Sequence, residues 1–269
     1  MDADREVTQR CAMPYTESMI VVRGTRIRVL RGGSGPPLIF LHGASGHVGW
    51  LPFLEWLSQR FDVIAPEHPG FGASDDPPWL DHASDLAYFY LDVIGALKLD
   101  RVHLMGTSLG GWIAAELGVR NTSRLASLTL VCAVGIAAND GLMDDIFRMS
   151  AEENARRFYA DPDRVRRRLA ALASADPRTL MRNRSTVVRL SYPHFVNPEL
   201  AKWLHRVDVP TLLVWGANDG LVPPRFGEAY RDRIPGATLV VIPQAGHAPF
   251  EEQPDAFLAA FDAFLDRHA

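Results

Sequence analysis

The fold is decided by residues 102–112, which read Val102-His103-Leu104-Met105-Gly106-Thr107-Ser108-Leu109-Gly110-Gly111-Trp112. The apolar run at the start has the length of a buried strand, and the apolar spacing after Trp112 is helical. Between the two lies the pattern G-x-S-x-G with Ser108 at its centre. In a strand, turn and helix context this pattern predicts a nucleophile elbow, a strained turn that exposes the serine hydroxyl above a sheet. Only residues as small as Gly106 and Gly110 let neighbouring backbone pass close to such a turn.

Other short apolar runs lie on both sides of the elbow. Two runs near the start, residues 19–22 and 26–30, predict an antiparallel hairpin that turns at Gly24. Strand-like runs and segments with helical spacing then alternate, which predicts an α/β fold with a mostly parallel sheet. The predicted strands are residues 38–41, 63–65, 102–105, 128–134, 211–215 and 238–242, and the predicted helices are residues 50–58, 85–97, 112–119, 224–233 and 254–267.

One long stretch interrupts this alternation. Residues 136–206 contain no strand-like run, and their helical patterns are broken by several prolines. We interpret the stretch as an inserted helical cap, or lid. The predicted organisation is an N-terminal arm at residues 1–18, a core domain at residues 19–135 and 207–269, and the helical cap at residues 136–206.

Composition restricts the function classes. The formal charge of −4 gives no general electrostatic attraction to nucleic acid or to an anionic membrane, and no window approaches about 18 consecutive apolar residues. The start of the chain lacks the apolar stretch of a secretory signal, so we expect a cytoplasmic protein. The two cysteines, Cys11 and Cys132, suggest neither a disulfide framework nor a metal cluster. We predict no cofactor and no metal, and the oligomeric state, a homodimer included, stays open.

A serine at an elbow needs a general base and an orienting carboxylate. Asp219 follows the predicted strand 211–215 in the loop Gly216-Ala217-Asn218-Asp219-Gly220, and His247 follows strand 238–242 in a comparable loop. Reacting groups of open α/β sheets gather at the carboxyl ends of the strands. We therefore expect Ser108, Asp219 and His247 to converge as a catalytic triad. The N–H of Leu109, at the start of the helix, is the first candidate donor of an oxyanion hole.

These motifs, together with Leu41-His42-Gly43 and Pro69-Gly70-Phe71-Gly72-Ala73-Ser74, resemble the α/β-hydrolase fold superfamily over residues 19–267. The resemblance implies a mostly parallel, eight-stranded sheet with helices on both faces. It also implies that the N–H of Ala44 is the second oxyanion donor and that His42 has a structural role in its loop.

The resemblance implies a serine hydrolase that forms an acyl-enzyme at Ser108, most simply a carboxylesterase acting on a small-molecule ester. Epoxide hydrolases and haloalkane dehalogenases of this superfamily carry Asp at the elbow, so Ser108 argues against both. A carbon–carbon bond hydrolase of the meta-cleavage-product type is an alternative, although such relatives generally carry Trp where Ala248 follows His247. A non-catalytic ligand receptor on the same scaffold is the third hypothesis.

Substrate contacts are predicted from side-chain type and from position near the elbow and the cap. Aromatic residues there are candidates for an apolar pocket, although ordinary core packing is the competing interpretation. Arginines near the end of the cap are candidates for binding a substrate carboxylate, whereas the arginines at residues 164 and 166–168 are typical of a solvated helix face. The candidates chosen are Trp50, Trp112, Arg182, Arg189 and Tyr192, and the others considered are Phe147, Arg184, Phe195 and Trp203.

Overall fold

The computed structural model describes residues 15–47, 49–138, 141–191 and 194–268. They form an eight-stranded sheet in the order β1-β2-β4-β3-β5-β6-β7-β8. The hairpin β1–β2 and the pair β2–β4 are antiparallel, and the pairs from β4 to β8 are parallel. The strands are β1 Thr16–Val22, β2 Thr25–Gly32, β3 Pro37–Leu41, β4 Asp62–Pro66, β5 Val102–Thr107, β6 Leu125–Val131, β7 Thr211–Gly216 and β8 Thr238–Ile242.

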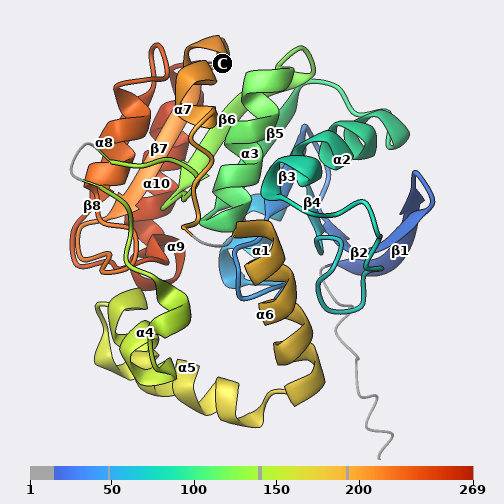
Figure 1. Cartoon of the computed structure of the whole chain (residues 1–269). Helices are drawn as coiled ribbons and strands as arrows, with labels where there is room; N and C mark the ends of the chain where they lie inside the picture. Colours follow the sequence, from blue (N-terminus) through green and yellow to red (C-terminus); the bar gives the residue numbers. More distant parts are fainter. Residues whose placement is uncertain (1–14, 48, 139–140, 192–193, 269) are drawn as a thin grey trace, which may run out of the picture.

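Helices cover both faces of this sheet (Figure 1). On one face α2 and α3 pack together, and on the other Phe53 of α1 meets Phe257 of α10 edge to face with ring centroids 6.2 Å apart. The strands β3, β5, β6 and β7 are nearly continuous apolar runs because both of their faces are covered. The helices of these layers are α1 Pro52–Ser58, α2 Ala83–Ala96, α3 Leu109–Arg120, α8 Arg225–Arg231, α9 Pro249–Glu252 and α10 Pro254–Asp266.

The predicted fold class, the hairpin and the order of strands and helices are confirmed, but the bounds of seven of the eight strands differ from the predicted runs by one to three residues, most at β1 and β6. Strand β1 begins at Thr16, which pairs with Arg31, so the sheet takes in residues that the sequence assigned to the N-terminal arm. Strand β6 ends at Val131, three residues before the end of the predicted run. Cys132 there has a φ of 46°, which turns the chain out of the strand. Residues 1–14 of the predicted arm lie outside the described residues.

Between β6 and β7 the described residues form helices. Figure 1 shows α4, α5 and α6 together at one end of the sheet. Helix α6 is fastened to the loop after β4, because Thr186 donates a hydrogen bond to the carbonyl oxygen of Gly70 at 2.7 Å. In the described part of the chain no helix is both long and apolar enough to cross a membrane. The helices are α4 Ala151–Phe158, α5 Pro162–Ser174, α6 Pro177–Ser191 and α7 Leu200–Trp203, with short 3-10 turns at Ile146–Arg148 and Leu204–Arg206.

Candidate active site

Ser108 sits in a strained turn between β5 and α3. Its φ of 53° and ψ of −115° are unusual for a residue with a side chain, and its N–H donates to the carbonyl oxygen of Val131 at 2.9 Å. A Cβ atom on Gly106 would lie 2.2 Å from the carbonyl oxygen of Gly110, and one on Gly110 would lie 2.1 Å from that of Leu41. The two glycines of the motif are therefore required by close backbone contacts, as an elbow demands.

Asp219 and His247 form a buried hydrogen-bonded pair. His247 Nδ1 lies 2.7 Å from Asp219 Oδ2, and both residues are less than 5% exposed. The other carboxylate oxygen, Oδ1, accepts the N–H groups of Leu221 at 2.9 Å and Val222 at 2.8 Å. With Nδ1–H donating to Asp219, the neutral imidazole keeps Nε2 unprotonated, which is the tautomer that a general base needs.

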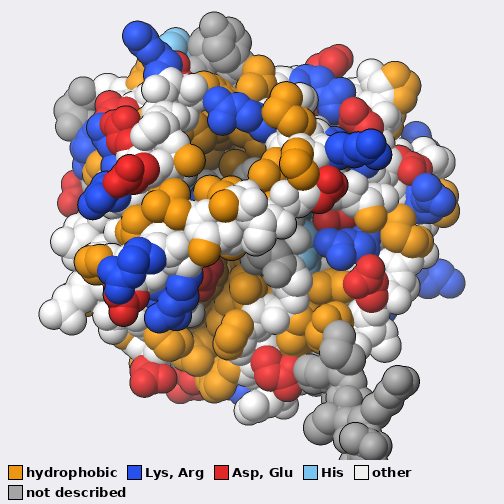
Figure 2. All heavy atoms as spheres, turned by 90° about the horizontal axis from the view of Figure 1, so that it is seen from below, with side chains coloured by type: hydrophobic (Ala, Val, Ile, Leu, Met, Phe, Trp, Pro, Cys, Tyr) orange, Lys and Arg blue, Asp and Glu red, His pale blue; other side chains and the backbone are white. Residues whose placement is uncertain are grey.

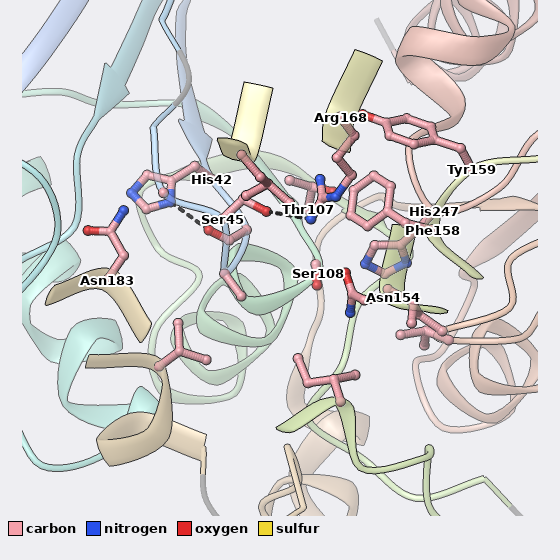
Figure 3. A pocket seen from close by; sticks show the side chains of 18 of the residues that line it. His42, Ser45, Thr107, Ser108, Asn154, Phe158, Tyr159, Arg168, Asn183 and His247 are labelled. Atoms are coloured by element: carbon pink, nitrogen blue, oxygen red, sulfur yellow. Dashed lines mark hydrogen bonds between the residues drawn. The ribbon is translucent and has the colours of Figure 1, made fainter. Parts of the chain in front are cut away.

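Ser108 and His247 line the same cavity of about 740 Å³, which lies between the sheet and helices α4 to α6. Figure 3 shows both side chains in this pocket, Ser108 from the elbow and His247 from the loop after β8. Figure 2, which looks onto the end of the molecule that carries these helices, shows a hollow with hydrophobic side chains in its depth and charged ones around it. A small molecule that enters the cavity therefore meets the hydroxyl and the imidazole together.

The two expected oxyanion donors belong to segments that adjoin Ser108. Leu109 is the first residue of α3, where backbone N–H groups have no acceptor within the helix. Leu109 is buried as a whole residue, directly after Ser108. Ala44 lines the cavity, and a Cβ atom on the preceding Gly43 would lie 3.3 Å from Ser108 Cβ, so this loop runs directly beside the serine. The roles of these two amides as oxyanion donors stay predictions.

Two buried histidines fix the loop that carries Ala44. His42 Nε2 accepts the N–H of His68 at 3.0 Å, so its Nδ1–H donates to the carbonyl oxygen of Gly43 at 2.8 Å. His68 Nε2 lies 2.9 Å from the carbonyl oxygen of His42, and its Nδ1 lies 2.5 Å from the hydroxyl of Tyr90. Burial lowers the pKa of His42 well below its usual value. His42 is therefore a neutral structural residue, as the sequence indicated.

One described group of potential metal ligands adjoins the candidate triad. The thiol of Cys132 lies within 4.8 Å of ligand atoms of Asp219 and His247. Burial raises the pKa of this thiol well above its ordinary value, so it stays protonated, whereas a metal binds the thiolate. Both oxygens of Asp219 already accept hydrogen bonds. These donors fit a hydrogen-bonded pair better than a metal centre.

The predicted aromatic substrate contacts need correction. Trp50 stacks on Tyr15 at 4.9 Å instead of lining the cavity, and its Nε1–H donates to Glu55 at 2.8 Å. Trp112 is buried in the core, where its Nε1–H donates to Glu116. Neither is free to meet a ligand because each packs against its own part of the core. Tyr192 lies outside the described residues.

The predicted basic contacts also need correction. Arg182 donates to the carbonyl oxygen of Gly72 at 2.7 Å, and Arg189 forms an ion pair with Asp76. Both arginines serve to fasten α6 to the loop after β4, so they do not line the cavity. Of the other residues considered, Phe147, Arg184 and Phe195 do line it.

Helix α5 supplies cavity residues that the sequence analysis assigned to solvent. Arg164, Arg167 and Arg168 line the cavity, whereas Arg166 is exposed and pairs with Asp163. The guanidinium of Arg168 lies 4.1 Å from the centre of the Phe158 ring, which in turn packs edge to face on His247 at 4.9 Å. Figure 3 shows these three side chains grouped on one side of the pocket.

The sequence contains a pattern that groups the cavity-lining residues of α5 on one face of the helix. Residues four apart lie on the same face of a helix, and Arg164, Arg168 and Leu172 have that spacing. All three line the cavity. The spacing shows that they share a face, but nothing in the sequence indicates that this face is turned toward Ser108 rather than toward water.

Several known proteins are similar to this chain. The family model of the α/β hydrolase fold matches residues 36–254. A pimeloyl-[acyl-carrier protein] methyl ester esterase of Nitrosomonas europaea is 30% identical over 253 residues, covering 88% of this chain and 98% of that protein. A 2-hydroxy-6-oxo-6-(2'-aminophenyl)hexa-2,4-dienoic acid hydrolase of Metapseudomonas resinovorans is 25% identical, covering 98% of this chain and 96% of that protein.

Among solved structures, a bacterial membrane phospholipase A is similar with a TM-score of 0.81 and 26% identity, covering 95% of this chain and 87% of that one. The match to the family model extends over most of the sequence, from β3 to the start of α10. The chain belongs to the α/β hydrolase family.

Proposed function

We propose that this protein is a serine-dependent carboxylic ester hydrolase that acts through an acyl-enzyme at Ser108. The observation that carries the proposal is the Asp219–His247 hydrogen bond of 2.7 Å, made through Nδ1, together with the cavity that His247 and Ser108 both line. A ligand receptor has no physical need for an oriented base beside a strained serine. The proposal therefore favours catalysis over the receptor hypothesis.

The positions of these groups support a reaction in two steps, acylation and deacylation of Ser108. His247 Nε2 removes the proton of Ser108 Oγ as the oxygen attacks the ester carbonyl carbon. The N–H groups of Leu109 and Ala44 donate to the resulting oxyanion. His247 then gives the proton to the departing alkoxide, which leaves an acyl group on Ser108. In the second step the same imidazole takes a proton from water as the water attacks the acyl carbon. The C–O bond to Ser108 then breaks, His247 returns the proton to Ser108 Oγ, and the acid is released.

The proposed substrate is a small ester with an apolar acyl portion. Most of the side chains that line the cavity are apolar or aromatic, including Phe147, Phe195 and Val222. The esterase relative from Nitrosomonas europaea is named for hydrolysis of a methyl ester, which supports a small alcohol portion.

A second candidate function has specific support. Four arginines, Arg164, Arg167, Arg168 and Arg184, line the cavity, whereas Glu251 is the only acidic residue on its described walls. An excess of cations in a partly desolvated space favours an anionic substrate. The relative from Metapseudomonas resinovorans is named for a dienoic acid, which carries a carboxylate. Hydrolysis of a carbon–carbon bond in a substrate of this type is therefore the alternative.

The test compares p-nitrophenyl esters of short and medium acids with a meta-cleavage dienoate, using the parent protein and Ser108→Ala. We expect ester turnover by the parent protein and none by the variant. Turnover of the dienoate alone would favour the alternative reaction. Absence of turnover with both substrate types would contradict both proposals and support a receptor. Ser185→Ala, which changes an exposed serine of α6, is the matched control.

A further inference from the structure

The junction between α4 and α5, residues 157–161, lies against both loops that carry the Asp219–His247 pair. The carbonyl oxygen of Arg157 accepts the N–H of Gly220 at 3.0 Å, one residue after Asp219. The carbonyl oxygen of Phe158 accepts the N–H of His247 itself at 2.6 Å. The junction is thus bonded to the acid loop and to the histidine loop through consecutive carbonyl groups.

The Glu252 carboxylate forms a second connection between the same parts. Its Oε1 accepts the N–H of Ala160 at 2.8 Å and that of Asp161 at 3.0 Å, both in the α4–α5 junction. Its Oε2 accepts the N–H of Gly246 at 2.5 Å, directly before His247. One side chain from the end of α9 therefore accepts three backbone donors from two segments that are far apart in the sequence.

The fit between these segments is tight. A Cβ atom on Gly246 would lie 2.4 Å from the carbonyl oxygen of Phe158 and 3.0 Å from Glu252 Oε2. The Phe158 ring also packs edge to face on the His247 imidazole. Only a residue without a side chain at position 246 allows the junction to approach this closely. The orientation of His247 is therefore determined by its contacts with the α4–α5 junction as well as by Asp219.

We propose that Glu252 is a positioning residue for His247, which it holds in place by tying the α4–α5 junction to the histidine loop. The inference rests on the proposed function in that His247 is taken to be the base of the reaction. Glu252 acts through backbone N–H groups and does not touch the substrate. Glu252 is not among the described residues that line the cavity, so its removal loosens the imidazole and reaches the cavity wall only through Phe158 and Tyr159 of the junction.

The first test uses Glu252→Gln and Glu252→Ala. The amide of Gln has one acceptor oxygen, so it can accept hydrogen bonds from the N–H groups of the junction or from that of Gly246, but not from both. Ala can accept neither. We expect kcat for a p-nitrophenyl ester to fall by about tenfold in Glu252→Gln and by about a hundredfold in Glu252→Ala, with KM nearly unchanged. Asp255→Asn, which removes a charge from an exposed acid at the start of α10, is the matched control.

The second readout does not depend on turnover. The proton that His247 Nδ1 donates to Asp219 is expected as a far-downfield proton NMR resonance in the parent protein and in Asp255→Asn. In Glu252→Gln this resonance should broaden or disappear at temperatures where circular dichroism shows a fully folded protein. Gly246→Ala should have the same effect, because the new methyl group would push the junction away from the histidine loop. This variant replaces the Glu252 variants if they do not fold.

The outcomes separate the two proposals. If the parent protein turns over no substrate, the proposed function fails, and the resonance still decides the role of Glu252. If folded Glu252→Gln keeps the kcat and the resonance of the parent protein, the positioning role is wrong. A lower melting temperature with kcat and resonance unchanged would mean that Glu252 only stabilises the fold, and it would overturn the inference as well.

Discussion

Asp219 uses its two carboxylate oxygens for different tasks, one to orient His247 and one to accept the N–H groups of Leu221 and Val222. An asparagine at this position keeps the shape but can present N–H to Nδ1, which favours the wrong imidazole tautomer. We predict that Asp219→Asn lowers kcat by about 10⁴-fold, measured under single-turnover conditions. The exposed Asp232→Asn is the control. A loss smaller than about tenfold would show that Asp219 does not orient the base.

Arg168 allows a test of the charge of the substrate. Its guanidinium lies over Phe158 and hydrogen bonds Ser45 Oγ at 3.2 Å, and its buried Nε has no partner among the described residues. If the substrate carries a carboxylate, Arg168→Gln should raise KM for it by about tenfold to a hundredfold and leave KM for neutral esters unchanged.

The control for Arg168 is Arg166→Gln, on the exposed face of the same helix. Equal effects of the Arg168 change on neutral and anionic substrates would indicate that the side chain supports the Phe158 ring rather than binding an anion. Kinetics with matched neutral and anionic esters distinguish these outcomes.

At the level of residues, the sequence carried the chemistry but not the walls of the pocket. Ser108, Asp219 and His247 each follow a recognisable strand in a short loop, and the structure bonds Asp219 to His247 and brings His247 and Ser108 to one cavity. Trp50 and Arg182 were wrong candidates for substrate contact because each contacts a residue that is distant in the sequence. Trp50 stacks on Tyr15, and Arg182 donates to the carbonyl oxygen of Gly72. Side-chain type does not reveal which residues are already engaged in the folded protein.

At the level of elements, the elbow depends on backbone contacts between β5, α3 and the end of β3. In Gly106→Ala the new Cβ would lie 2.2 Å from a carbonyl oxygen of the backbone, which cannot move without displacing α3. We predict that this change lowers the free energy of unfolding by about 3 kcal/mol or more, measured by urea denaturation.

Gly95 provides the matched comparison for that prediction. It lies inside α2, and a Cβ atom there would meet nothing within 4 Å. Gly95→Ala should raise the free energy of unfolding by about 0.5–1 kcal/mol, because alanine is the better helix former. Equal effects of the two substitutions would contradict the close approach at the elbow.

The predicted strands and helices mostly match the observed ones because buried parallel strands are apolar throughout and flanking helices keep a regular spacing. Errors arise at the ends, where tertiary contacts decide. Thr16 joins β1 because Arg31 pairs with it, and Cys132 leaves β6 through a positive φ that a side-chain-bearing residue seldom adopts. Hydrophobic patterning contains neither kind of information.

At the level of the whole molecule, neutral histidines in the loop after β3 and bonded to it make the free energy of unfolding depend on pH. Burial lowers the pKa of His47 to about 4 and that of His68 to about 3, while the unfolded chain has ordinary values near 6.5. The unfolded state therefore binds more protons than the folded state between these values. The contribution of these two histidines to the free energy of unfolding is fully present above about pH 6.5. It is lost as the pH falls toward their folded-state pKa values.

We predict that each of these two groups removes up to about 1.4 kcal/mol per pH unit from the free energy of unfolding between about pH 6 and pH 4. Urea denaturation at several pH values measures the slope. His68→Gln should make the slope shallower, although the variant starts from a lower stability because Tyr90 and His42 lose a partner. A free energy of unfolding that stays constant over this range would contradict the conclusion that burial keeps His47 and His68 neutral.

The arrangement of the molecule as a whole was the least predictable part. The sequence indicates helices between β6 and β7, but not that residues 157–161 contact the loops of Asp219 and His247. Those contacts run through backbone carbonyl groups and the Glu252 carboxylate, and any residue type can supply a carbonyl group. Only the three-dimensional structure shows them.

The proposed function requires Ser108 as the nucleophile and His247 as its base. The most direct measurement is mass spectrometry of the protein after incubation with a reactive alkyl phosphonate, with peptide mapping of the adduct. We predict one adduct, on Ser108, that is absent in Ser108→Ala and forms far more slowly in His247→Ala. An adduct on another residue, or labelling that is equally fast in His247→Ala, would contradict the account.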